Sequence, residues 1–212
     1  MKKKLRYIDY YFITDPKLSR KGIASDVACA LRAGCRIVQY REKEKSAKDM
    51  IDEASRIKGI CGNKALFLIN DRVDVALAVD ADGVHLGQED MDLKTARKLL
   101  GEKKVIGITV HTLEEALKAE NDGADYVAVS PIYTTGTKTD AGKACGTGMI
   151  EKIRGGIKLP IVAIGGIGKK NAPDAIRAGA DSVAAISAVL CSDDVEKEVG
   201  EFVASIKRSR TG

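Results

Sequence analysis

The sequence has no tryptophan, and only 4% of its 212 residues are aromatic. Proline is also scarce, with 4 residues, whereas glycine reaches 21 and 44% of the chain is hydrophobic. These proportions exclude collagen-like and low-complexity chains. They indicate packed aliphatic strands and helices joined by short glycine turns, and the length fits a single domain over residues 1–212.

Long apolar runs and paired cysteines are missing as well. No uncharged run approaches the roughly 20 residues that a helix needs to cross a bilayer. The basic opening MKKKLR is followed by only a short apolar stretch between Asp9 and Asp15, so no export signal is expected. The five cysteines contain no C-x-x-C pair, which argues against a disulfide framework or a zinc site. We expect a cytoplasmic protein with no membrane partner.

The excess of positive charge is confined to the ends of the chain. The formal net charge is +5, from 35 basic and 30 acidic residues. Seven of the basic residues lie within residues 2–6 and 207–210, so 28 basic residues face 30 acidic ones between these segments. Because this body is slightly acidic, no basic face is indicated, and we predict no nucleic-acid binding.

One phrase recurs along the chain: an amphipathic helix, a turn of small residues and a short apolar strand. Copies span residues 30–40, 76–86, 119–129 and 175–186, and Gly34, Gly123 and Gly179 stand where helices commonly end in a left-handed residue. Apolar runs predict eight strands, at residues 10–13, 36–40, 65–69, 83–86, 105–109, 126–129, 161–164 and 182–186. Helical patterns lie between most of them, for example at 47–57, 93–100, 113–120 and 172–178, which predicts parallel strands.

Eight strand–helix units predict an α/β fold, a single (β/α)8 TIM barrel. The length lies near the lower limit of about 200 residues for this fold, which leaves little room for another domain. The main alternative is an open doubly wound sheet, but the usual G-x-G-x-x-G is absent after Ile13. Since barrel enzymes carry their chemistry after the carboxyl ends of the strands, those segments supply the candidate site residues.

Cations follow the second predicted strand. Side chains alternate along a strand, so Gln39, Arg41 and Lys43 should share one side. A guanidinium and an ammonium group on that side suit phosphate oxygens. The alternative is a solvated cluster of charges, as expected for the following Glu44 and Lys45.

Carboxylates follow the next two strands. The third strand ends in Asn70 and Asp71, and Asp90 lies shortly after the fourth. Two carboxylates beside the cations predict Mg²⁺ held together with a diphosphate. The alternative is that Asp71 and Asp90 cap the helices that follow them.

Hydroxyls and glycines follow the last three strands. Residues 130–148 form the longest loop-like stretch, with Lys138 as its first cation, and such a loop can close over a ligand or simply connect two elements. Gly166 and Ser187 follow the seventh and eighth strands, the usual phosphate site of this architecture. Two anion sites, only one of them metal-assisted, imply two phosphorylated small-molecule substrates.

Other catalytic chemistries are disfavoured. His85 and His111 have no H-E-x-x-H spacing and no third ligand, so we expect hydrogen-bonded barrel groups rather than zinc ligands. No G-x-S-x-G turn surrounds Ser130 or Ser187, which argues against nucleophilic hydrolysis.

Six fragments, in order, closely resemble thiamine phosphate synthase: QYREK (39–43), LIND (68–71), DGVHLGQED (82–90), SPIYTTGTK (130–138), PIVAIGGI (160–167) and AGADSVAAIS (178–187). The match spans nearly the whole chain. It implies a transferase of thiamine biosynthesis that condenses 4-amino-2-methyl-5-hydroxymethylpyrimidine diphosphate with 4-methyl-5-(2-phosphoethyl)thiazole. The products would be thiamine monophosphate and pyrophosphate.

The resemblance also implies a role for each matching residue. The pyrimidine diphosphate would contact Gln39, Arg41, Lys43, Asn70 and Lys138, with Asp71 and Asp90 on Mg²⁺ and Thr109 where the family commonly has Ser. The thiazole phosphate would contact Thr135, Thr137, Gly166, Ile186 and Ser187. The metal, Arg41, Lys43 and Lys138 would neutralise departing pyrophosphate, leaving a resonance-stabilised cation that the thiazole nitrogen captures.

Three other functions remain open: a thiazole tautomerase of the same superfamily, another phosphate-binding barrel such as an isomerase of amino-acid biosynthesis, and a non-catalytic ligand-binding barrel. The tautomerase needs no diphosphate site and is disfavoured by Arg41, Lys43, Asp71 and Asp90 together. The sequence does not decide whether the chain forms a homo-oligomer.

Overall fold

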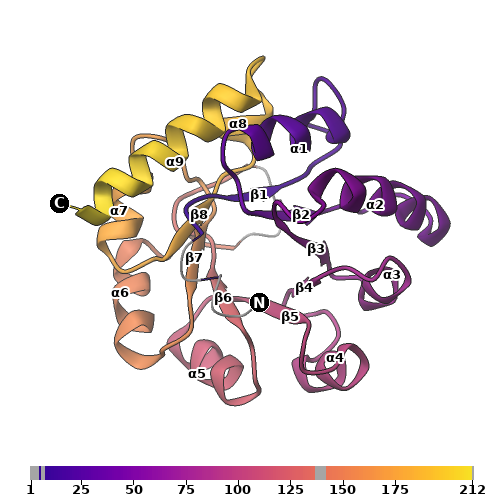
Figure 1. Ribbon diagram of the computed structural model, residues 1–212. Helices are drawn as coiled ribbons and strands as arrows, with labels where there is room; N and C mark the ends of the chain where they lie inside the picture. The colour runs from indigo at the N-terminus through magenta and orange to yellow at the C-terminus, as the bar shows by residue number, and fades with distance from the viewer. Residues whose placement is uncertain (1–4, 6–7, 137–141, 212) are drawn as a thin grey trace.

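The computed structural model describes residues 5, 8–136 and 142–211. Within them the predicted TIM barrel is confirmed: eight strands form one parallel sheet in the order β1-β2-β3-β4-β5-β6-β7-β8, ringed by helices (Figure 1). A parallel bridge between Tyr10 and Val183 joins the two edges of the sheet. Because the strand order never reverses, the doubly wound alternative is wrong.

The strands are β1 (Tyr11–Ile13), β2 (Ile37–Tyr40), β3 (Leu66–Asn70), β4 (Gly83–Leu86), β5 (Val105–Val110), β6 (Tyr126–Val129), β7 (Ile161–Ile164) and β8 (Ser182–Ala184). The helices are α1 (Ile23–Arg32), α2 (Ala47–Cys61), α3 (Val73–Ala78), α4 (Leu93–Leu100), α5 (Leu113–Asn121), α6 (Thr147–Gly156), α7 (Ala172–Arg177), α8 (Ser187–Leu190) and α9 (Val195–Thr211). None of the helices in the described ranges combines the length and apolarity needed to span a membrane.

Most boundaries lie within two residues of the predicted ones, and α2 shows why one does not. Ser46 caps this helix by accepting a hydrogen bond from the Asp49 amide at 3.2 Å. Its buried residues continue at helical spacing from Met50 to Cys61, beyond the predicted end at residue 57. Gly62, with φ of 47°, then ends the helix.

The turns of the recurring phrase end helices in the predicted way. Gly34, Gly123 and Gly179 have φ values of 97°, 90° and 106°, in the left-handed region. The remaining copy, at residues 76–86, has Asp80 at this position, with φ of 51°. Aspartate tolerates this conformation better than most residues, because its short polar side chain forms local hydrogen bonds.

An aspartate two residues further on ties neighbouring strands together. The Oδ2 atoms of Asp82, Asp125 and Asp181 each accept a hydrogen bond at 2.8 Å from a backbone amide of Phe67, Ile106 and Ile161, respectively. These amides lie in the first two residues of β3, β5 and β7. Each carboxylate thus satisfies a donor at the start of the neighbouring strand and fixes the alignment of a strand pair.

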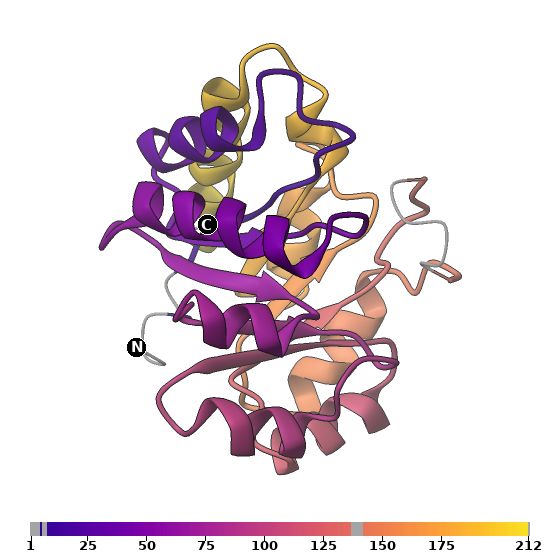
Figure 2. The same cartoon turned by 90° about the vertical axis from the view of Figure 1, so that its right-hand side faces the viewer.

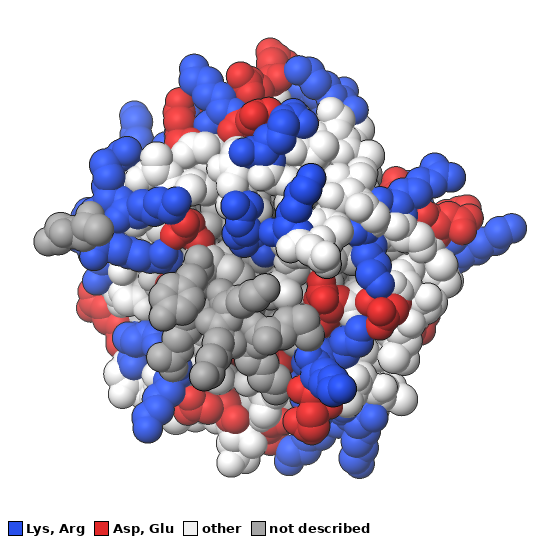
Figure 3. All heavy atoms as spheres, in the orientation of Figure 1, with Lys and Arg blue, Asp and Glu red and all other residues white. Residues whose placement is uncertain are grey.

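The two ends of the barrel differ in what they carry. In Figure 2 the strand arrows point to one side, and the segments flanking residues 137–141 project from that side. Figure 3 shows the opposite end, where Lys and Arg lie among Asp and Glu.

We expect Asp125→Ala to lower the free energy of unfolding by about 3 kcal/mol, the cost of breaking a buried ion pair. Asp125 is buried and accepts from both the Ile106 amide and the Arg97 guanidinium, 2.7 Å away. Urea denaturation measures the change. The control is Asp193→Ala, whose exposed pair with Arg20 should contribute less than about 1 kcal/mol. Equal losses in the two variants would contradict the role of Asp125.

Candidate active site

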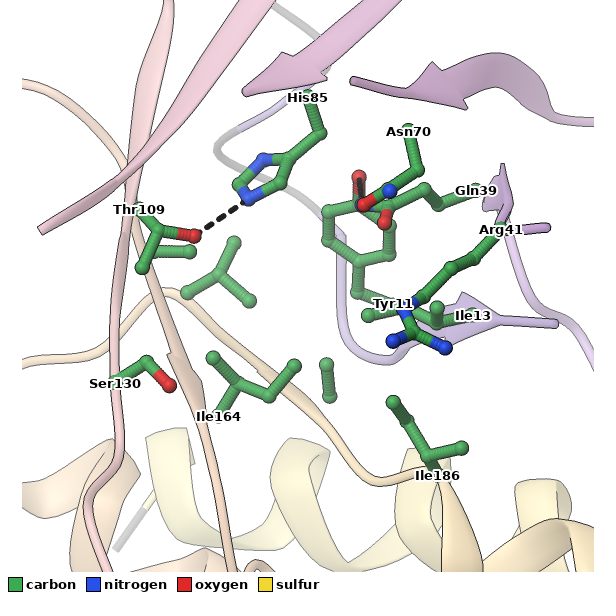
Figure 4. A pocket seen from close by; sticks show the side chains of 13 residues that line it. Tyr11, Ile13, Gln39, Arg41, Asn70, His85, Thr109, Ser130, Ile164 and Ile186 are labelled. Atoms are coloured by element: carbon green, nitrogen blue, oxygen red, sulfur yellow. Dashed lines mark hydrogen bonds between the residues drawn. The ribbon is translucent and has the colours of Figure 1, made fainter. Parts of the chain in front are cut away.

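Two cavities open at the carboxyl ends of the strands and share a wall. The first is lined by Tyr11, Ile13, Gln39, Arg41, Asn70, His85, Thr109, Ala128, Ser130, Val162, Ile164, Ala184 and Ile186 (Figure 4). The second is lined by Ser130, Thr135, Ile164, Gly165, Gly166, Ile167, Ala184, Ala185, Ile186 and Ser187. Ser130, Ile164, Ala184 and Ile186 belong to both, so the two cavities adjoin.

Most predicted site residues line these cavities. Gln39, Arg41, Asn70 and Thr109 line the first, Thr135, Gly166 and Ser187 the second, and Ile186 both. Lys43, Asp71 and Asp90 lie outside both linings and form a neighbouring group. Thr137 and Lys138 lie outside the described residues, so their predicted roles stay predictions.

Arg41 presents an unpartnered donor. Its guanidinium points into the first cavity (Figure 4), and one terminal nitrogen donates to Asp15 Oδ2 at 3.1 Å. Its Nε is the one buried side-chain nitrogen or oxygen in the described part of the chain that has no hydrogen-bond partner. A buried donor without a partner costs free energy, so this atom is prepared for an acceptor from a ligand.

Asp15 is a site residue that the sequence analysis missed. Its side chain is 8% exposed and its carboxylate partly balances the charge of Arg41. The Arg41 amide also donates to Thr14 Oγ1 at 2.9 Å. The segment after β1 therefore holds the end of β2 in place, and only its position beside β2 in the sheet gives it this role.

Two carboxylates and an ammonium group meet at the rim. Lys43 Nζ pairs with Asp71 Oδ2. Burial, followed by the neighbouring Asp90 carboxylate, raises the pKa of Asp71, and Lys43 opposes this shift. Asp90 Oδ2 accepts from the Gly87 amide at 2.7 Å. Asp71 and Asp90 therefore lie close enough to repel each other.

The helix-cap interpretation of these carboxylates is wrong. The residues at the N-caps of α3 and α4 are Arg72 and Asp92, not Asp71 and Asp90. Asp71 instead adopts a left-handed φ of 62°, and its amide donates to the His85 carbonyl at 2.8 Å. A residue other than glycine adopts this backbone conformation at an energetic cost, and such residues cluster at functional sites.

A chain of hydrogen bonds crosses the barrel at the first cavity, whose lining includes all of its members except Tyr126. Gln39 Nε2 donates to the Tyr11 hydroxyl at 2.8 Å, and the hydroxyls of Tyr11 and Tyr126 are 2.7 Å apart. His85 lies 2.8 Å from Tyr126 through Nδ1 and 2.9 Å from Thr109 Oγ1 through Nε2. The prediction that His85 is a hydrogen-bonded barrel group is confirmed.

The sequence analysis did not predict a role for Tyr11 and Tyr126, the two tyrosines of this hydrogen-bond chain. Residues 107 and 126 lie opposite each other in the β5–β6 register, and a Cβ on Gly107 would lie 2.0 Å from the Tyr126 ring. Gly107 thus provides the space for that ring. The available signal was a glycine in one apolar strand and a tyrosine in the next, but only the register relates them.

The second cavity depends on a glycine turn after β7. Gly165 and Gly166 have φ values of 96° and 63°. Cβ atoms there would lie 2.6 Å from Pro131 Cα and from the Thr134 carbonyl oxygen, respectively. Glycine is favoured here for two reasons: the turn requires left-handed residues, and it packs closely against the segment after β6.

His111 lies in the segment after β5. Its Nδ1 is 2.6 Å from the carbonyl oxygen of Ser130. No group of three or more His, Cys, Asp or Glu residues suited to a metal ion occurs among the described residues. A site of the zinc-enzyme type is therefore not seen there, and the Asp71–Asp90 pair is the remaining candidate for a cation.

Comparison with known proteins finds relatives that match nearly the whole chain. Residues 10–189 match the model of the thiamine monophosphate synthase family. The chain is 58% identical to thiamine-phosphate synthase of Methanosarcina barkeri over 97% of this chain and 94% of that protein, and 40% identical to that of Clostridium acetobutylicum over 98% and 100%. Thiamine phosphate pyrophosphorylase from Pyrococcus furiosus superposes with a TM-score of 0.89 at 38% identity, over 97% of this chain and 98% of that one. From the matching barrel, the strand-end residues and these relatives, we conclude that the chain belongs to the thiamine monophosphate synthase family.

Proposed function

We propose that this protein is the transferase of thiamine biosynthesis that joins 4-amino-2-methyl-5-hydroxymethylpyrimidine diphosphate to 4-methyl-5-(2-phosphoethyl)thiazole. The products are thiamine monophosphate and pyrophosphate. The observation that carries the proposal is the pair of adjoining cavities on one rim: Arg41 lines the first, whereas no charged side chain of the described residues lines the second. Lys43 and Asp71, which pair with each other, follow the strands that bring Gln39 and Asn70 to the first cavity. The relatives named above, which are thiamine-phosphate synthases, support the same reaction.

The first cavity fits the pyrimidine diphosphate. The ring would occupy the deeper part, where Gln39 and Thr109 offer polar atoms. The diphosphate would lie toward Arg41, whose Nε–H donates to no protein atom. A guanidinium binds phosphate oxygens through geometrically fixed N–H groups, so Arg41 both neutralises and orients the diphosphate.

We assign a Mg²⁺ ion to Asp71 and Asp90. The fit rests on two carboxylates near enough for Asp90 to raise the pKa of Asp71, a repulsion that a divalent cation would relieve. Magnesium commonly takes one or two protein carboxylates, with phosphate oxygens and water as its other ligands. When bound, the ion stabilises negative charge on the departing pyrophosphate. Lys43, which pairs with Asp71 here, then lies beside the same charge.

The second cavity fits the thiazole phosphate. Its lining combines the glycine turn after β7 with Thr135 and Ser187, at the usual phosphate position of this fold. Glycine allows backbone N–H groups to approach an anion closely. The phosphate would therefore be bound by hydrogen bonds alone, without a metal ion.

The protein contributes charge neutralisation and positioning to the reaction. The shared wall, mainly Ile164, Ala184 and Ile186, lies where the two rings would meet. Apolar side chains there exclude water, which would otherwise capture the pyrimidine cation. Because the new bond joins two substrates held in contact, no protein nucleophile is required.

The direct test supplies both phosphorylated substrates with and without Mg²⁺. We expect thiamine monophosphate and pyrophosphate in equal amounts only when both substrates and the metal are present, and chelation should abolish turnover. Chromatography with a pyrophosphate assay measures both products. Absence of both products under all conditions would overturn the proposal, and isomerisation of the thiazole alone would indicate the tautomerase.

Asp71→Asn is expected to reduce magnesium-dependent turnover at least about 100-fold, because it removes one negative ligand. Asparagine also tolerates the left-handed backbone, so the thermal unfolding midpoint should stay within about 4 °C. The matched control is Asp74→Asn, an exposed carboxylate three residues away that pairs with Arg72. Normal turnover by Asp71→Asn would show that Asp71 does not bind the essential ion.

Ser187→Ala is expected to raise KM for the thiazole phosphate at least about tenfold and to leave KM for the pyrimidine diphosphate within about twofold, because a lost hydrogen bond to a charged group costs roughly 1.5–3 kcal/mol. Steady-state kinetics with each substrate varied in turn distinguishes the two effects. Ser182→Ala is the control, since that hydroxyl donates to the Asp9 carbonyl at the opposite end of β8. Equal changes in both KM values would refute separate sites.

A further inference from the structure

The hydrogens available for bonding in the hydrogen-bond chain at the first cavity can be counted. Gln39, Tyr11, Tyr126, His85 and Thr109 come from β2, β1, β6, β4 and β5, and each link measures 2.7–2.9 Å. A phenol donates one hydrogen, and a neutral imidazole carries one N–H and one acceptor nitrogen. Each link needs one hydrogen, so the direction of one link determines the direction of the next.

The tyrosines keep their hydrogens. Both side chains are only 1% exposed, and burial raises the pKa of Tyr11 and Tyr126 well above the usual value for a phenol. A phenolate in this chain is therefore excluded near neutral pH. The two links that involve Tyr126 must then run in the same direction, since its single hydrogen serves only one of them.

Gln39 sets the direction at one end. Its amide nitrogen donates to the Tyr11 hydroxyl. Because the Tyr11 hydroxyl oxygen accepts this hydrogen bond, the hydroxyl hydrogen of Tyr11 serves the link to Tyr126.

We infer that Tyr11 and Tyr126 are positioning residues that hold His85 with its hydrogen on Nε2 and thereby direct the Thr109 hydroxyl hydrogen into the first cavity. Tyr11 donates to Tyr126, Tyr126 donates to His85 Nδ1, and His85 Nε2 donates to Thr109 Oγ1. The remaining Thr109 hydrogen points to the ligand. The chain thus makes Thr109 a donor for an acceptor atom, such as a pyrimidine ring nitrogen. Only the identity of that ring rests on the proposed function.

The histidine tautomer is the direct readout, and it requires no substrate. The chain has 2 histidines, so a His111→Gln variant assigns the His85 signals in long-range ¹H–¹⁵N correlation spectra at pH 8. We expect hydrogen on Nε2 and a deprotonated Nδ1 in the native protein. Hydrogen on Nδ1, or on both nitrogens, would overturn the inference.

Tyr126→Phe tests whether the chain imposes this state. The variant should show a mixture of His85 tautomers, and its kcat/KM for condensation should fall about tenfold. The control is Tyr40→Phe, which removes a buried hydroxyl from the other side of β2, where it donates to Glu53 at 2.6 Å. That control should leave the tautomer unchanged. An unchanged His85 tautomer in folded Tyr126→Phe would overturn the inference.

A double-mutant cycle tests whether Tyr126 acts through Thr109. In a Thr109→Val background, Tyr126→Phe should have little further effect on kcat/KM, whereas in a Thr109→Ser background, which keeps the hydroxyl, it should lower kcat/KM as it does in the native protein. Independent, multiplicative losses would overturn the coupling.

If Tyr126→Phe does not fold, Tyr11→Phe replaces it. A full native preference for hydrogen on His85 Nε2 in that variant would overturn the inference that the hydrogen-bond chain sets the tautomer. Failure of condensation by the native protein would refute the proposed function while leaving the tautomer result intact.

Discussion

The site depends on one geometric constraint, the alternation of side chains along parallel strands that all end at the same rim. Residues two apart, such as Gln39 and Arg41 on β2 or its end, both face the interior. Each strand therefore delivers only one or two side chains to the cavities. The site therefore contains few polar side chains, and each of them needs a hydrogen-bond or ion-pair partner from another strand.

These partners nearly balance the charges of the site, but among the described residues they leave one donor without an acceptor and one carboxylate without an ion-pair partner. Asp15 offsets Arg41, and Lys43 offsets Asp71, whereas Arg41 Nε has no partner and Asp90 adds a second carboxylate beside Asp71. Each imbalance costs folding free energy. A diphosphate with a divalent cation would relieve both at once, which is the physical basis for assigning the two ligands together.

Periodicity and turn chemistry predicted the barrel, because each strand–helix unit carries its own local signal. The same local signals placed Gln39, Arg41 and Asn70 at the first cavity and Gly166 and Ser187 at the second. They could not predict contacts that depend on register between distant segments. Asp15 beside Arg41 is one such contact, and the Tyr11–Tyr126 pair, 115 residues apart, is another. A tyrosine in an apolar strand gives no sequence signal that distinguishes a packing role from a role in a hydrogen-bond chain.

The aspartate ties at the start of the strands have a consequence for how the chain reaches this structure. The three ties link residues 15, 19 and 20 positions apart, whereas the contact between the Ser182 hydroxyl and the Asp9 carbonyl joins residues 173 positions apart. Closing a short loop costs less chain entropy than closing a long one. The entropy therefore favours assembly of three pre-aligned strand pairs before the first and last strands meet, so the ring is completed by its most expensive contact.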